Sequence, residues 1–144
     1  MIIGKMTITK LMLLAMLIAL PSGLVFAEMN SDTMFQTGSV NGINYIAGGI
    51  GLDEREALSA IAGSKYNVKL VFALIARNYV SDIPIEITNK SGKKVLEVIS
   101  SGPVFYVNLP PGAYTVRASY EGVAITHHIN AGSAAARQVV FGWR

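Results

Sequence analysis

GPVFYVNLPPGAYTVRASY, residues 102–120, contains two strand patterns on either side of a proline-rich turn. Val104–Asn108 forms the first pattern. Leu109–Gly112 (LPPG) predicts a turn, because each proline fixes φ and lacks an amide donor, while glycine allows positive φ. After the turn, apolar and polar residues alternate, which places Tyr114, Val116, Ala118 and Tyr120 on one face. We therefore predict that the turn links two adjacent antiparallel strands whose apolar face is covered by a second layer.

Similar patterns lie on both sides of this stretch. Short runs of alternating or continuous apolar residues, separated by turn residues, favour a β-sandwich of about seven strands. Val116 and Phe72 are both expected in the core between the sheets. Pro84 cannot donate to a ladder, so it indicates an edge position or a bulge. The strand patterns outside the opening stretch are Ile43–Ala47, Tyr66–Ala76, Ile83–Thr88, Lys93–Ile99, Val123–Ile129 and Gln138–Trp143.

One short α-helix is predicted at about residues 53–62, before the most apolar strand. Asp53 and Glu56 have the spacing of a capping box, so capping explains both carboxylates without acid–base chemistry. Gly63 is a suitable residue to end the helix. Gly48–Gly51 precedes the helix and lacks the lysine and hydroxyl residues of a phosphate-binding loop, which favours a simple strand-to-helix turn. The expected apolar stripe consists of Ala57, Leu58, Ile61 and Ala62.

The N-terminus has the order of a signal peptide, residues 1–27. Lys5 and Lys10 give the positive region, and Leu11–Leu20 is an apolar run too short to span a bilayer. Val25-Phe26-Ala27 ends in the small residue that a signal peptidase requires. We expect residues 28–42 to be a flexible segment and residues 43–144 to form the sandwich domain.

Charge and cysteine content bear on compartment and partners. Two of the 12 Lys and Arg residues lie in the expected signal peptide, so the mature chain is nearly balanced against 9 Asp and Glu. We therefore expect no nucleic-acid partner. Lys90, Lys93 and Lys94 surround a predicted hairpin turn and indicate a solvated tip. Export without any cysteine is typical of bacteria, which predicts a periplasmic or secreted protein.

The segment Ile83–Gly122 resembles carboxypeptidase-regulatory-like domains, which carry a turn of the N-x-x-G-K kind followed by L-P-P-G-x-Y-T-V. The resemblance implies an immunoglobulin-like or transthyretin-like β-sandwich. The chain from Tyr45 onward is also similar to small exported proteins of Gram-negative bacteria that have a G-G-x-G turn and a D-E-R-x-A-L helix. Transthyretin-like hydroxyisourate hydrolases end in Y-R-G-S, whereas this chain ends in Phe141-Gly142-Trp143-Arg144, so the resemblance does not carry that activity.

The residues suggest no catalytic, cofactor-binding or metal-ligating set. His127 and His128 are neighbours on an expected strand, so their side chains should point to opposite faces and not share a metal. A sugar-stacking platform would need exposed aromatic residues, whereas in sandwiches such residues more often fill the core or its rim. The candidates for stacking are the six tyrosines and Trp143, and among them Tyr106, Tyr114 and Tyr120 are expected to fill the core or its rim.

The sequence therefore favours a non-catalytic periplasmic module that binds an envelope protein or polymer. The alternatives are a carbohydrate-binding module with exposed aromatics and an enzyme of unrecognised type. We expect no nucleic-acid partner and no stable membrane span after cleavage. The ligand, pathway and oligomeric state stay open, as does any role of His127 and His128.

Cleavage after Ala27 is directly testable. The charged region, the short apolar run and the small residue at the cleavage point predict that the protein in the cell envelope begins at Glu28. N-terminal sequencing of the protein purified from that fraction checks this, and a chain that begins at Met1 contradicts it.

Overall fold

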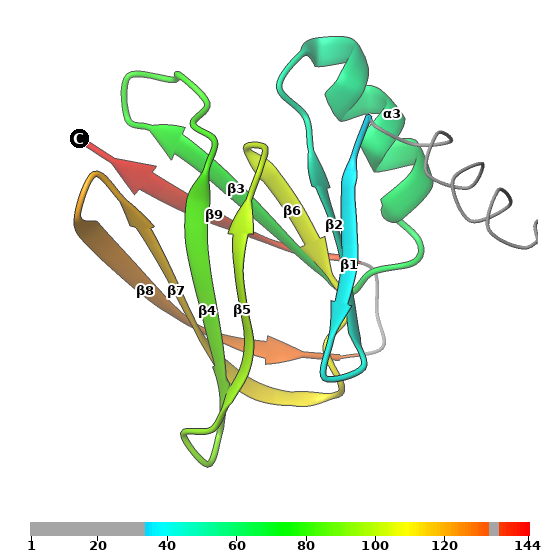
Figure 1. Cartoon of the computed structure of the whole chain (residues 1–144), viewed down its shortest axis with the longest axis vertical. Coiled ribbons are helices and arrows are strands. Elements are labelled where there is room, and N and C mark those ends of the chain that lie inside the picture. Colours follow the sequence, from blue (N-terminus) through cyan, green and yellow to red (C-terminus); the bar gives the residue numbers. More distant parts are fainter. Residues whose placement is uncertain (1–33, 133–135) are drawn as a thin grey trace, which may run out of the picture. The chain divides into compact units, whose positions relative to one another are not determined.

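A computed structural model describes residues 34–132 and 136–144, which belong to the compact unit Met34–Arg144. The expected signal peptide, residues 1–27, lies outside the described residues. The described part consists of nine strands and one helix (Figure 1). The elements are β1 (Gln36–Val40), β2 (Ile43–Gly48), α3 (Leu52–Ala62), β3 (Val68–Leu74), β4 (Ile83–Asn89), β5 (Lys94–Ser100), β6 (Val104–Val107), β7 (Gly112–Tyr120), β8 (Val123–Ala131) and β9 (Arg137–Trp143).

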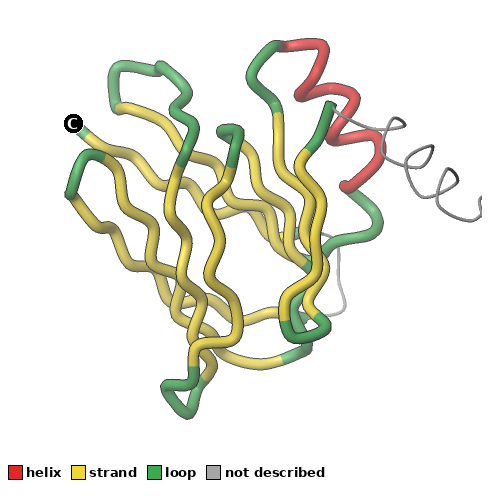
Figure 2. The backbone as a smooth tube through the Cα atoms, in the orientation of Figure 1, coloured by secondary structure: helices red, strands yellow, loops and turns green. Residues whose placement is uncertain are grey.

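The strands form two sheets, which confirms a mainly β fold with one short helix. One sheet has the order β1-β2-β6-β3-β9 and the other the order β5-β4-β7-β8. Within the five-stranded sheet, β9 runs parallel to β3, whereas the other pairings are antiparallel. Figure 2 shows strands making up most of the trace, with loops gathered at their ends. The described residues thus contain nine strands where the sequence predicted about seven.

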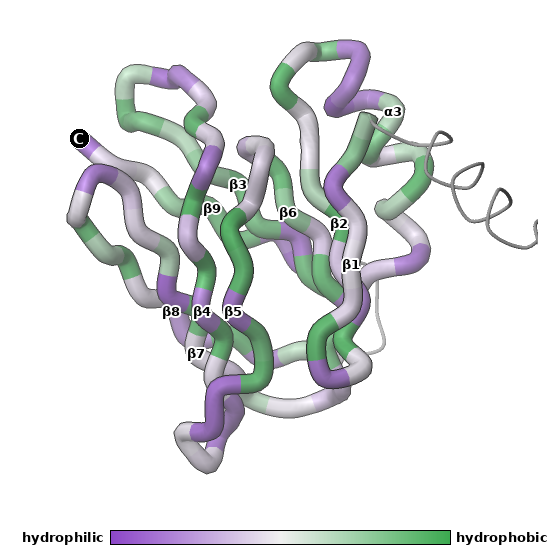
Figure 3. The backbone as a smooth tube through the Cα atoms, viewed as in Figure 1, coloured by the Kyte–Doolittle hydropathy of each residue, from purple (hydrophilic) through white to green (hydrophobic). Residues whose placement is uncertain are grey.

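The core lies between the two sheets and contains residues from both. Phe72 and Val116, which were predicted to be core residues, have no solvent exposure. Phe72 packs against Phe141 and Trp143 of β9, with ring centroids 5.6 and 6.4 Å apart. In Figure 3 the hydrophobic segments are concentrated in the strands, whereas the turn between β4 and β5 is hydrophilic. Alternation along β3 and β7 therefore identified the buried faces of these two strands correctly.

The prediction that Leu109–Gly112 links adjacent strands is wrong. β6 pairs with β2 and β3 in the five-stranded sheet, whereas β7 pairs with β4 and β8 in the other. The segment crosses from one sheet to the other at the lower end of the view in Figure 1. Every residue of β6 is buried, which suits a central strand covered on both faces. Two consecutive prolines without amide donors suit a crossing between sheets better than a ladder-forming turn.

The expected flexible segment, residues 28–42, contains strand β1, so that expectation is wrong for residues 36–40. β1 pairs with β2 through a turn in which Asn41 and Gly42 have φ of 52° and 77°. Asn-Gly favours this two-residue hairpin turn, since both residues tolerate positive φ. The Gln36 side chain also accepts a hydrogen bond from Ser101 N and donates one to Ile99 O. Val40 is the one large apolar residue of β1, so the strand has no alternating hydrophobic pattern in the sequence.

The helix is confirmed, but its predicted cap is wrong. Gly51 is the N-cap and no side chain caps the helix, while Asp53 lies inside the first turn. The adjacent carboxylate of Glu54 instead accepts a hydrogen bond from Gly49 N at 3.0 Å. Gly63 ends the helix with a right-handed φ of −59° rather than the left-handed conformation of a C′ glycine.

Helix α3 covers part of the outer side of the five-stranded sheet. Leu58 and Ala62 pack on Ile46 of β2 and Tyr106 of β6, whereas the sequence analysis placed Ile61 in the buried stripe as well. The Ile61 side chain is 43% exposed. The buried stripe is therefore narrower than predicted.

Strand β4 lies between β5 and β7, so the predicted edge position of Pro84 is wrong. The pairing of β4 with β7 begins at Ile85, one residue beyond the proline. The register shift in β4 falls between Ile87 and Thr88 rather than at Pro84. A proline is tolerated in this inner strand because it lies at its start, where no β7 partner needs its missing amide.

The substitution Phe72→Ala should destabilise the protein by about 3–5 kcal/mol, since it empties a fully buried site that the neighbouring rings cannot refill. Lys93→Ala, at an exposed position near the β4–β5 turn, should change the free energy of unfolding by less than about 0.5 kcal/mol. Urea-induced unfolding of both variants measures the difference. Equal unfolding midpoints would show that the core has been assigned to the wrong face.

Candidate binding face

The outer side of the four-stranded sheet has no helix over it in the described part of the chain. We call this side the outer face. Its residues alternate with the buried Ile85, Ile87, Val116 and Ala118 of β4 and β7. Alternation and strand register place Pro84, Glu86, Thr88, Glu97, Ile99, Thr115, Arg117, Ser119, Thr126 and His128 on the outer face.

A charged row crosses the middle of the outer face. Glu86 of β4 lies opposite Glu97 of β5 on one side and Arg117 of β7 on the other. Two facing carboxylates repel each other, and Lys94 Nζ lies between them, 2.9 Å from Glu97 and 3.5 Å from Glu86. The hydrogen bond to Glu97 is the main cause that raises the pKa of Lys94, and Glu86 adds to it. Lys94 therefore stays protonated at neutral pH and holds the carboxylates together.

Two hollows lie on the outer face. The upper hollow has a volume of about 440 Å³ and is lined by the charged row together with Pro84, Ile99 and Ser119. The lower hollow has a volume of about 380 Å³ and lies between the β4–β5 turn and strands β7 and β8. Its lining includes Thr88, Asn89, Lys90, Thr115, His128 and Asn130.

The side chains of the lower hollow are partly fixed by hydrogen bonds. Thr115 Oγ1 lies 3.1 Å from Nδ1 of His128, its cross-strand partner. The Asn89 side chain accepts hydrogen bonds from Ser91 N and Lys93 N, each at 3.0 Å. The backbone of Asn89 adds two further bonds, to Lys93 O and from Gly92 N. The turn that carries Lys90 is therefore closed by four hydrogen bonds.

A larger hollow of about 460 Å³ lies beside the crossing between β6 and β7, and Asn67, one of the polar residues that line it, has a structural role. Asn67 Nδ2 donates to Leu109 O at 2.7 Å and to Gly132 O at 2.8 Å. Asn67 Oδ1 accepts from Leu109 N at 2.9 Å. Because these bonds occupy both ends of the amide, we place the candidate site on the outer face instead.

The two histidines point to opposite faces, as the sequence predicted. His127 is half-buried, with its ring edge-on to Phe141 at a centroid distance of 4.7 Å. His128 is exposed on the outer face. Among residues 34–132 and 136–144, no group of three or more His, Cys, Asp or Glu side chains is placed to hold a metal ion.

The aromatic residues considered for sugar stacking belong mainly to the core. Tyr106, Tyr114 and Trp143 are buried, and Tyr120 is half-buried with its ring 5.7 Å from that of Trp143. Tyr114 donates its hydroxyl hydrogen to Pro110 O at 2.7 Å, and burial raises the pKa of this phenol. Tyr114 is therefore a neutral donor that secures the crossing between the sheets. These four residues do not form an exposed row.

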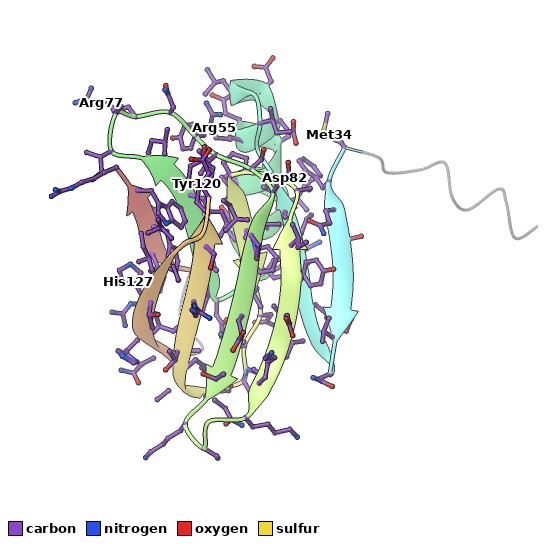
Figure 4. All side chains as sticks on the ribbon, turned by 60° about the vertical axis from the view of Figure 1, so that its left-hand side comes forward. Met34, Arg55, Arg77, Asp82, Tyr120 and His127 are labelled. Atoms are coloured by element: carbon purple, nitrogen blue, oxygen red, sulfur yellow. The ribbon has the colours of Figure 1, made fainter. Side chains whose placement is uncertain are left out.

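The glycine loop before α3 is filled by side chains of the helix. Glu54 accepts the hydrogen bond from Gly49 N, and Arg55 Nη1 donates to Gly49 O and Ile50 O. The Arg55 guanidinium also lies over the ring of Tyr79, 4.5 Å from its centroid. Figure 4 shows Arg55 at the end of the sheets that also carries Arg77. A carboxylate thus occupies a loop amide that a phosphate would need, in keeping with a strand-to-helix turn.

Sequence reasoning did not find the outer face as a site. Alternation showed which residues of each strand face solvent, but it did not show which strands are neighbours. The contact between Thr115 and His128 depends on the pairing of β7 with β8. The short Glu121-Gly122 turn was the available signal, since it makes these two strands a hairpin.

Comparison with known proteins assigns no function to this surface. No protein-family model matches the chain. No curated protein matches it either. Among the described residues, no helix has the length and apolar character needed to cross a membrane.

The substitution Asn67→Ala should destabilise the protein by about 2–4 kcal/mol, because it removes three hydrogen bonds and leaves the Leu109 amide without its acceptor. Asn78→Ala is the matched control, since the Asn78 side chain is exposed, and it should change stability by less than about 0.5 kcal/mol. Thermal unfolding of both variants followed by circular dichroism compares them. Similar losses for Asn67→Ala and Asn78→Ala would show that the amide does not hold the crossing.

Proposed function

We propose that this protein is a non-catalytic periplasmic module that binds an envelope protein or polymer on its outer face. The observation that carries the proposal is the contrast between the two sheets. The five-stranded sheet has α3 packed over β2 and β6. The four-stranded sheet leaves its outer face uncovered in the described part, with two hollows along it.

The chemistry of the outer face suits recognition by side chains. Arg117 is exposed and, with the neighbouring Glu86, offers a donor and an acceptor of opposite charge side by side. Ile99 is 58% exposed beside the upper hollow and offers an apolar contact. Protein interfaces commonly combine such groups, with arginine enriched at their centres.

The outer face is also pre-organised. Its residues lie on paired strands, and the Lys94 ion pairs and the contact between Thr115 and His128 restrict several side chains before any partner arrives. Binding therefore loses less side-chain entropy than binding by a flexible loop. A rigid surface of this kind fits a module whose role is to hold a partner.

Export and family are part of the proposal. The signal-peptide pattern of residues 1–27 supports export to the periplasm. The resemblance of Ile83–Gly122 to carboxypeptidase-regulatory-like domains supports a sandwich of that kind, and because such sandwiches serve many functions, the proposed role rests on the outer face.

Site-specific photo-crosslinking in cells tests this function. A photoreactive amino acid is placed at Thr126 or Ile99 on the outer face, and at Ser59 of α3 or Thr37 of β1 as controls, all of which are exposed. We expect discrete adducts, or a polymer smear that glycan-degrading enzymes collapse, from Thr126 and Ile99 alone. Adducts of equal yield at all four positions, or at none, would overturn the proposal.

A further inference from the structure

The lower hollow of the outer face is lined by the ammonium-bearing Lys90 together with residues that carry hydroxyl and amide groups, and its lining contains no carboxylate. We propose that it binds a segment of an anionic glycan, with Lys90 and Lys93 pairing with the acidic groups. This inference rests on the proposed function and commits it to a polymer with a defined charge and many hydroxyls. The hydrogen-bonding residues of the lining are Thr88, Asn89, Thr115, His128 and Asn130.

Charge complementarity is the first argument. In the described part of the chain, both ion pairs belong to Lys94, which engages Glu86 and Glu97, the carboxylates of the charged row. Lys90 and Lys93 are exposed and form no ion pair with the described residues. Lys90 lines the hollow and Lys93 belongs to the same turn, so this turn carries two positive charges that no described carboxylate compensates. A polyanion would supply the missing counter-charges, and its affinity would fall with salt as these pairs are screened.

The rigidity of the turn is the second argument. The four hydrogen bonds made by Asn89 close the turn, so the backbone positions of Lys90 and Lys93 are fixed relative to the sheet. A disordered turn would lose backbone conformational entropy when it binds a ligand. The β4–β5 turn is already ordered, so only its lysine side chains lose entropy on binding. The turn projects beyond the sheets at the lower end of Figure 1, where a long polymer could reach it.

The row of hydrogen-bonding side chains is the third argument. Thr88, Thr115 and His128 lie opposite one another on three neighbouring strands, so the row extends about 10 Å across the sheet. Threonine hydroxyls and an imidazole both donate and accept hydrogen bonds, as sugar hydroxyls do. A row of this length suits an extended chain of sugars better than a single small anion.

A glycan fits this hollow better than an anionic membrane surface. Binding at a lipid surface normally inserts exposed apolar side chains next to the basic ones. Of the apolar residues that line the hollow, Tyr114 and Ile129 are buried, and the exposed Ala113 offers only a methyl group. The large exposed apolar side chains Ile50, Ile75 and Tyr79 lie outside this lining. A hydrated polyanion is therefore the occupant that the surface favours.

The test measures binding of the exported protein to dextran sulfate, with neutral dextran of the same length as the probe control. The variant Lys90→Gln/Lys93→Gln should weaken the Kd for dextran sulfate about tenfold and flatten its dependence on salt. Arg77→Gln/Arg144→Gln removes the same charge from the opposite end of the sheets, where Figure 4 labels Arg77, and should change the Kd less than about twofold. Thr115→Val should weaken it about threefold, because it removes one hydroxyl and the contact of that hydroxyl with Nδ1 of His128.

This inference is overturned if the protein does not bind dextran sulfate, or if it binds neutral dextran equally tightly. It is also overturned if the two double variants lose the same affinity for dextran sulfate. Tighter binding to vesicles of phosphatidylglycerol and phosphatidylcholine than to dextran sulfate would overturn it as well. Unchanged urea-unfolding midpoints for all three variants ensure that a loss of binding is not a loss of fold. Crosslinking on the outer face without affinity for dextran sulfate would leave the proposed function standing and remove this inference alone.

Discussion

The side-chain amide of Asn67 holds the β6–β7 connection, one of the segments in which the chain passes from one sheet to the other. Its three hydrogen bonds join the residue before β3 to Leu109 in the crossing and to Gly132 after β8, and its backbone carbonyl accepts from Arg137 N at the start of β9. Pro110 and Pro111 cannot donate hydrogen bonds, so a side chain must satisfy the groups around them. The Tyr114 hydroxyl adds a further side-chain hydrogen bond, to Pro110 O. The fixed crossing sets where β7 begins, and therefore the register of the sheet that carries the outer face.

Alternation along single strands predicted much of the fold. The errors arose because a sequence pattern does not show which strands pair with one another. Phe72 and Val116 were placed in the core correctly, because period-two patterns report which face is buried. The LPPG segment was misassigned, because two strands flanking a turn look the same in sequence whether they pair or belong to different sheets. β1 was missed since a polar edge strand has no hydrophobic pattern. The helix was found at the right place, but its first-turn carboxylates serve the Gly49 loop rather than a cap.

The candidate site was predictable only in its components. Strand geometry alone indicated that His127 and His128 point to opposite faces, and the structure confirms it. Their neighbours depend on long-range pairing, as the contact of His127 with Phe141 shows. Lys94 illustrates the same limit, since its pairing with Glu86 requires the β4–β5 register as well as the local spacing to Glu97. The sequence shows the outward-facing positions of each of the four strands. Which of these positions lie side by side is known only once the order of the strands in the sheet is known.

The outer edges of the sheets bear on how this protein can bind. An exposed edge strand invites pairing with another chain. In β5, the carbonyls of Val95 and Ile99 accept hydrogen bonds from the side chains of Asn41 and Gln36. In β8, Val123 O accepts from Trp143 Nε1 at 2.9 Å. Because side chains of β9 and of the β1 hairpin already bond these carbonyls, addition of a partner strand to β5 or β8, the two edges of the four-stranded sheet, would have to break these hydrogen bonds. Recognition by side chains on the outer face has no such cost, which is why its charges and hydroxyls are the groups expected to select the partner.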